Sequence, residues 1–166
     1  MIFRKALESE VDEIWTILQY AIERRKQDGS KQWQDGYPNP ETIRYDIAKE
    51  WAYVLADEMG ILAYGAVIFE DDPDYATITG QWLTERDYVV VHRVAAAARA
   101  KGMGIATQLF QHIETLAKSR KIFSIKVDTN FDNLAMLRIL EKLGYQYCGD
   151  VTIRDSKRMA FEKCLD

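Results

Sequence analysis

The stretch Val94–Leu109, VAAAARAKGMGIATQL, carries the strongest fold signal in the chain. Small apolar residues end a strand, a loop with Gly102 and Gly104 follows, and helical periodicity begins near Ile105. The first N–H groups of a helix lack intrahelical partners, and the helix dipole adds partial positive charge there. Glycine lets an anion approach such groups because it has no β-carbon. The stretch therefore predicts a phosphate-binding turn, or a tight strand-to-helix turn that needs glycine only for its backbone.

Acidic side chains are missing around this loop. Residues 88–113 contain no Asp or Glu, but they contain Arg93, Arg99 and Lys101. The segment carries +3 in a chain of net charge −4, which leaves −7 for the remainder. Carboxylates would repel an anionic ligand, so the gap supports an anion site. The acidic remainder argues against a nucleic-acid partner and favours a cationic amine as the second ligand.

The composition is that of a globular protein. The chain has 166 residues, of which 48% are hydrophobic, and we expect one domain over residues 1–166. Two cysteines and two histidines form neither a disulfide framework nor a metal-ligand spacing, so we expect no metal. No apolar run has the roughly 18 residues of a membrane span, and the N-terminus lacks the apolar core of a signal peptide. We therefore expect a cytoplasmic protein without a membrane partner.

Hydrophobic periodicity predicts the order of the elements. Strands are expected near 2–6, 51–57, 61–69, 75–80, 87–96, 123–127, 145–152 and 158–163. Helices are expected at 11–26, from Pro40, from the glycine loop to about 118, and from Leu134 to the stop at Gly144. Hairpins in the middle and helical crossovers late in the chain predict an α+β fold. Its centre is a mixed, mostly antiparallel β-sheet flanked by helices, as a three-layer α/β sandwich.

Two motifs in this order resemble the GNAT superfamily of acetyl-CoA-dependent N-acetyltransferases. The first, Arg/Gln-x-x-Gly-x-Gly/Ala, is matched by Lys101, Gly104 and Ala106, with lysine in the first position. The second, an asparagine and a helix before Leu-Gly-Phe/Tyr, is matched by Asn133 and the run Leu143-Gly144-Tyr145. The expected element order agrees with the family along nearly the whole chain. The resemblance implies the GNAT fold and acetyl transfer to a small-molecule or peptide amine.

The resemblance also implies which residues bind acetyl-CoA. The backbone of Val94 and Ala96 would hold the pantetheine arm, the Val94 region would supply the oxyanion donor, and Asn133 would lie near the thiol end. The pyrophosphate would be held by the loop and the first helical turn, which comprise Lys101, Gly102, Met103, Gly104, Ile105, Ala106 and Thr107.

One position departs from the family pattern. Leu140 stands where many members carry a tyrosine that protonates the leaving thiolate. Another hydroxyl, Tyr145 or Tyr88, could take that role, or a thiolate could leave unaided because thiol pKa values are near about 8.5. The third alternative is a non-catalytic acyl-CoA-binding module. A structural protein that kept the fold and lost the cofactor is a further hypothesis.

An ammonium ion must lose a proton before it can attack, so a general base is needed. His92 is a candidate because it has the same strand parity as Val94 and Ala96, and Asp128 is a second because it ends the strand before the second motif. Either could instead be structural, with His92 packed in the sheet and Asp128 capping a turn. Arg93 should point away from His92 if the strand is regular.

Three aromatic residues are candidates for the acceptor site. Trp33 and Tyr37 lie in the loop that GNAT proteins place over the acceptor, and Trp82 lies before the long apolar strand. The alternative is a surface loop pinned by one tryptophan. The oligomeric state stays open, although homodimers are the commonest assembly of soluble proteins.

Overall fold

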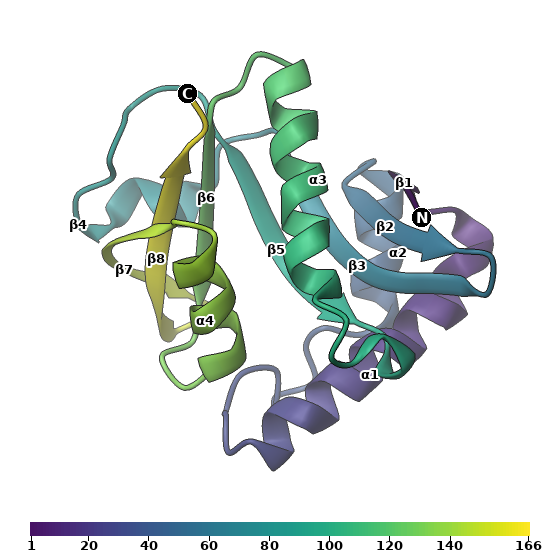
Figure 1. Cartoon of the computed structure of the whole chain (residues 1–166). Helices are drawn as coiled ribbons and strands as arrows, with labels where there is room; N and C mark the ends of the chain where they lie inside the picture. The colour runs from purple at the N-terminus through teal and green to yellow at the C-terminus, as the bar shows by residue number, and fades with distance from the viewer.

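The computed structural model describes all residues, 1–166, and contains one eight-stranded sheet (Figure 1). The strand order is β1-β2-β3-β5-β6-β8-β7-β4, and every neighbouring pair is antiparallel except β5 with β6. The strands are β1 Ile2–Lys5, β2 Ala52–Asp57, β3 Gly60–Ile68, β4 Thr79–Gly80, β5 Val89–Ala96, β6 Ser124–Thr129, β7 Gln146–Ile153 and β8 Ser156–Cys164. The helices are α1 Val11–Gln27, α2 Pro40–Ala48, α3 Ile105–Ser119 and α4 Leu134–Lys142. The predicted α+β fold is confirmed.

The helices form a layer on each side of the sheet (Figure 1). The apolar stripe of α3, from Ile105 to Ala117, packs with α4 onto one face. Ile14 and Leu18 of α1, with Ile43 of α2, cover the other face. Alternation along β2 serves both layers, since Leu55 faces α3 and Val54 faces α1. These two layers leave the middle of the sheet as the place where α1, α3 and α4 come together.

β5 and β6 separate half-way along their length. Their ladder has only three pairs, which end at Val91 opposite Val127. β5 continues to Ala96 and β6 to Thr129 without pairing with each other, and Figure 1 shows the two strands diverging toward their C-terminal ends. The facing backbone edges are therefore available to a ligand there.

A bulge in β5 lies at this point of separation. Ala66 pairs with His92 and Tyr64 pairs with Ala95, so two residues of β5 oppose Gly65 alone. Arg93, one of the two, has a φ of 57°, which is unusual for a residue with a side chain. The expectation that Arg93 points away from His92 assumed a regular strand and is wrong, because the bulge lets both side chains line the same spaces.

Most predicted boundaries are confirmed, and two expectations are wrong. Asn39 caps α2 by accepting from the Thr42 amide, and Gly144 follows α4 with a φ of 86°, both as expected. The strand expected at 75–80 is a 3₁₀ turn, Pro73–Thr77, followed by the two-residue β4. Asp72 causes this by accepting the Asp74 amide at the start of the turn.

Candidate active site

The loop before α3 presents unpaired backbone donors. The amides of Gly102, Gly104 and the first three residues of α3, Ile105, Ala106 and Thr107, donate no hydrogen bond within the protein. Gly102 and Gly104 have φ values of 79° and 66°, and an added β-carbon would meet nothing within 4 Å at either. The glycines are thus required by backbone conformation, and the space beside them is open. This cradle fits a diphosphate group, and the exposed Lys101 stands beside it. Arg99 is instead paired with Asp57 at 2.7 Å.

A cavity of about 90 Å³ lies where β5 and β6 separate. Val91, His92 and Val94 line it from β5, and Val127, Asp128 and Thr129 line it from β6. The remaining lining is Arg25, Gln32, Trp33, Tyr37, Arg93, Phe110, Asn133, Met136, Ile153, Arg154 and Arg158. Most of the polar candidates therefore meet here, although Trp33, Asp128 and Asn133 come from distant parts of the chain.

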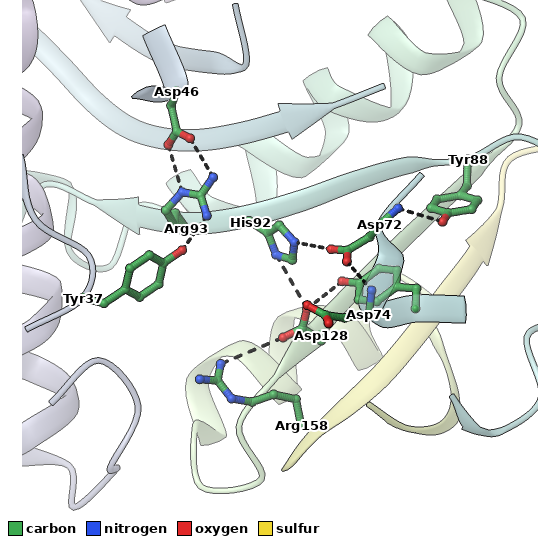
Figure 2. Close-up of polar contacts among 10 residues, drawn as sticks. Tyr37, Asp46, Asp72, Asp74, Tyr88, His92, Arg93, Asp128 and Arg158 are labelled. Carbon is green, nitrogen blue, oxygen red and sulfur yellow. Dashed lines mark hydrogen bonds and ion pairs between the residues drawn. The ribbon is translucent and has the colours of Figure 1, made fainter. Parts of the chain in front are cut away.

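His92 lies between two carboxylates (Figure 2). Its Nε2 is 3.0 Å from Asp72 Oδ2, and its Nδ1 is 3.6 Å from Asp128 Oδ2. The first contact is a hydrogen bond, and the second is too long to be one. If Nε2 carries the proton toward Asp72, Nδ1 presents a lone pair on the side of Asp128. Burial raises the pKa of Asp72, but the hydrogen bond and charge of His92 outweigh it and hold that pKa below its usual value.

Asp128 is held by donors on both oxygens. Tyr75 donates to Oδ2 at 2.6 Å, and Arg158 Nη1 lies 3.9 Å from Oδ1. The Asp128 side chain is only 4% exposed. Burial, and then the charge of Asp128, raise the pKa of Tyr75 well above its usual value, so this phenol stays protonated as a donor.

A second hollow, of about 420 Å³, reaches His92 from the α2 side of the sheet. Its walls include Tyr45 of α2 and the acidic residues Glu70, Asp71 and Asp72. Tyr37, His92 and Arg93 line both spaces. The imidazole thus stands at the boundary between an acidic hollow and the cavity between the strands.

Arg93 supports the bulge through a buried network (Figure 2). Its Nε and Nη2 donate to the two oxygens of Asp46 at 2.9 and 2.7 Å, and its Nη1 donates to the Tyr37 hydroxyl at 2.6 Å. Tyr64 also donates to Asp46, whose side chain is fully buried. This charge-assisted fork explains how the strand holds an arginine at positive φ beside His92.

The loop between α1 and α2 is tied to the loop before α4. Ser30 donates to Asp132 at 2.6 Å, and Asn133 Nδ2 donates to Gln32 Oε1 at 2.9 Å. Asn133 also accepts from the Met136 amide as the N-cap of α4. The ties place Trp33 and Tyr37 in the cavity wall, where sequence reasoning expected them.

Two candidates lie away from the cavity lining. Tyr145 is buried against Phe110, its hydroxyl has no partner, and burial followed by the charge of Glu114 raises its pKa well above the usual value. Trp82 packs on Tyr75 and donates to its carbonyl. Leu140, at the position of the missing tyrosine, is fully buried in the core beside α3.

Four further residues of the site were not singled out from the sequence: Arg25, Asp72, Tyr75 and Arg158. Asp72 and Tyr75 belong to a segment whose Asp-Asp-Pro-Asp run indicates only a turn. Arg25 stands among other basic residues at the end of α1, where cations suit any helix. No local signal distinguishes these four from ordinary surface residues.

The family comparison decides between the remaining interpretations of the fold. A family model described as the acetyltransferase (GNAT) family matches residues 15–145. The chain belongs to the GNAT acetyltransferase family. Among curated proteins, no match was found. The family supports acetyl transfer in general and acts on amines.

Solved GNAT structures agree with this assignment. A GNAT acetyltransferase of Streptococcus agalactiae 2603 is 34% identical, with a TM-score of 0.90 and coverage of 99% of this chain and 95% of that one. A candidate acetyltransferase of Staphylococcus aureus Mu50 is 26% identical, with a TM-score of 0.77 and full coverage of both chains, 100% each. A ribosomal-protein-alanine N-acetyltransferase of Brucella melitensis, 17% identical over 99% and 100% of the two chains, shares the fold at a TM-score of 0.68. No helix of this GNAT protein is both long and apolar enough to span a bilayer.

Proposed function

We propose that this protein transfers an acetyl group from acetyl-CoA to a primary amine, with both substrates bound together and the amine attacking directly. The observation that carries the proposal is the opening between β5 and β6. It has five free amides beyond one end and His92 with Asp128 at the other. We also propose that residues 1–166 act as one domain, since β1 and β8 belong to one sheet.

Acetyl-CoA supplies an acyl group already activated as a thioester. The amides from Gly102 to Thr107 would hold its pyrophosphate, and the unpaired edge from Val94 to Ala96 would align the pantetheine arm. A Val94 amide on that edge would stabilise the developing oxyanion. Asn133 lines the cavity and would contact the arm near the sulfur.

The proton of the acceptor ammonium is assigned to His92. Asp72 holds Nε2, so the free Nδ1 can accept a proton from an amine between His92 and Asp128. Asp128 would stabilise the cation through its charge, because Tyr75 and Arg158 keep it a poor base. Asp72 is then a positioning residue that fixes the imidazole tautomer.

Replacing His92 with glutamine tests this role. We expect kcat/KM for an accepted amine to fall about 10²- to 10⁴-fold and the acidic limb of its pH profile to disappear, because the proton acceptor is lost. Glutamine can still bond Asp72, so the melting temperature and the acetyl-CoA dissociation constant should change little. His112→Gln, which removes the histidine stacked on Phe3, is the control and should keep full activity. Full activity in His92→Gln would assign the base elsewhere.

The leaving thiolate is proposed to need no dedicated acid, given that Leu140 is buried and apolar. Tyr145→Phe tests the competing hydroxyl. Because the Tyr145 hydroxyl is buried without a partner, its removal should leave kcat unchanged and leave stability unchanged or raise it by about 1 kcal/mol. A fall in kcat of tenfold or more, with an unchanged fold by circular dichroism, would make Tyr145 the acid.

A non-catalytic acyl-CoA-binding module is the second candidate, and Leu140 is the observation that favours it. Thermal unfolding with acetyl-CoA, combined with thiol release on a panel of amines, separates the two. A ligand at 100 times its dissociation constant stabilises the native state by about 2.7 kcal/mol. Stabilisation without thiol release on any amine would support the module, and no stabilisation would reject both functions.

A further inference from the structure

Arg25 is an enclosed cation without an anionic partner. Its guanidinium lies 3.7 Å above the Trp33 ring and lines the cavity between β5 and β6. Its one hydrogen bond runs from Nη1 to the Ala21 carbonyl at 3.3 Å, and its Nε is shielded from solvent with no acceptor. Burial, and then the charge of Arg158, lower its pKa to about 10. A buried charge is costly unless it is paired, so the free chain leaves this donor unsatisfied.

The other arginines of the cavity have carboxylates nearby. Arg93 is bonded to Asp46, Arg154 lies 3.0 Å from Asp35, and Arg158 lies 3.9 Å from Asp128. Arg25 has no such group within ion-pair distance. The cavity therefore has one guanidinium in excess of its carboxylates.

A second unsatisfied group lies in the same lining. Thr129 is 1% exposed, and its hydroxyl has no hydrogen-bond partner. Arg25 and Asn133 also line a neighbouring hollow of about 380 Å³, which offers room for the rest of a ligand. Arg25, Arg158 and Thr129 together present charged and neutral donors, the set that a carboxylate accepts.

We infer that the acceptor carries a carboxylate beside its amine, as an α-amino acid does, and that Arg25 binds this carboxylate with Arg158 and Thr129. A chain of contacts links the two ends of such a molecule to the site. Arg158 faces Arg25 on one side and Asp128 on the other, and Asp128 lies 3.6 Å from His92. An amine and a carboxylate on neighbouring atoms match this spacing of a basic pocket next to the proton acceptor. The inference rests on the proposed acetyl transfer, for which it names the acceptor class.

The local charge contrasts with that of the whole chain. The net charge of −4 favours cationic ligands over the surface at large. The acidic hollow on the α2 side agrees with this and would attract the ammonium group. The cavity beyond His92 has the opposite sign, so a zwitterion satisfies both.

The test compares the proteinogenic α-amino acids with their α-carboxamides in a thiol-release assay with acetyl-CoA. Each pair shares an amine and a side chain and differs in the carboxylate charge. We expect at least one acid to be acetylated with a kcat/KM about tenfold or more above its amide. An amide acetylated as well as its acid would overturn the inference and leave acetyl transfer in place.

Arg25→Met should raise the KM for the accepted acid about tenfold or more and leave its amide and acetyl-CoA unaffected. Arg25→Lys keeps the charge but loses the fork, and an intermediate KM is expected. The matched control is Arg24→Met, which removes the neighbouring exposed arginine that pairs with Asp28 at 3.8 Å. If Arg25→Met fails to fold, Arg25→Lys and Arg158→Gln carry the test. Equal losses for acid and amide would show that Arg25 only supports the Trp33 loop.

A binding measurement separates this inference from catalysis. The CoA-saturated protein is titrated with the same acids and amides while the arginine Nε–H resonances are followed by NMR, with Arg25 assigned through Arg25→Lys. We expect an acid, and not its amide, to shift the Arg25 resonance. No shift with any acid overturns the carboxylate site. A shift without thiol release supports the site while acetyl transfer fails.

Discussion

Asp46→Ala is expected to lower the free energy of unfolding by about 3–5 kcal/mol, the cost of leaving a buried ion uncompensated. Asp46 is fully buried and accepts from Arg93 Nε and Nη2 and from Tyr64. Without it, the Arg93 side chain would keep only the Tyr37 hydroxyl as a hydrogen-bond partner. The Arg93 backbone at positive φ would also lose the fork that holds the bulge. Urea unfolding followed by circular dichroism measures the loss.

A matched surface pair provides the control for this prediction. Asp57 forms a similar two-bond fork with Arg99, at 3.0 and 2.7 Å, but both side chains are about one-third exposed. Solvent screens such pairs, so Asp57→Ala should cost far less stability than Asp46→Ala. Equal losses would contradict the view that the buried network, rather than any Arg–Asp fork, stabilises the bulge. A folded Asp46→Ala protein should also lose activity, because His92 adjoins Arg93.

Gly104→Glu is expected to raise the acetyl-CoA dissociation constant at least about 100-fold, or abolish binding, with the fold retained. The substitution places a carboxylate where free amides await a diphosphate, so like charges repel in a site that holds no other acid. The open space beside Gly104 means that the side chain meets no steric clash inside the protein. Isothermal titration with acetyl-CoA gives the dissociation constant, and circular dichroism gives the fold.

Gly104→Ala separates charge from backbone strain in this experiment. Both variants place a β-carbon at a φ of 66°, which costs about 1–2 kcal/mol of stability. Alanine adds no charge, so we expect it to bind acetyl-CoA much more tightly than the glutamate variant. Equal affinities in the two variants would assign the effect to loop conformation, and tight binding by Gly104→Glu would place the phosphate site elsewhere.

The parts of the fold that sequence reasoning predicts are those set by local chemistry. The glycine loop and the stripe of α3 depend on neighbours in sequence, and the structure confirms the helix start at Ile105. The bulge at Arg93 could not be predicted, because the apolar strand runs through it and no glycine marks it. Its cause is Asp46, 47 residues away. Tertiary contacts of this kind override strand regularity and leave no local pattern.

The candidate site divides in the same way. His92 and Asp128 follow from strand parity and strand end, and the structure brings them to the same cavity. The partners that set their chemistry, Asp72 and Tyr75, come from a turn 20 and 53 residues from the groups they hold. Arg25 resembles its neighbour Arg24 in sequence, and only packing against Trp33 distinguishes the enclosed arginine from the exposed one.

The ties from Ser30 to Asp132 and from Gln32 to Asn133 have a consequence for the order of events at the site. One asparagine caps the helix beside the thioester and also holds the loop that forms the acceptor wall. A molecule that stiffens either side must therefore stiffen the other, and thermodynamic linkage makes the effect mutual. We expect each substrate to bind more tightly when its partner is already in place, so that the free enzyme prefers to fill both halves together.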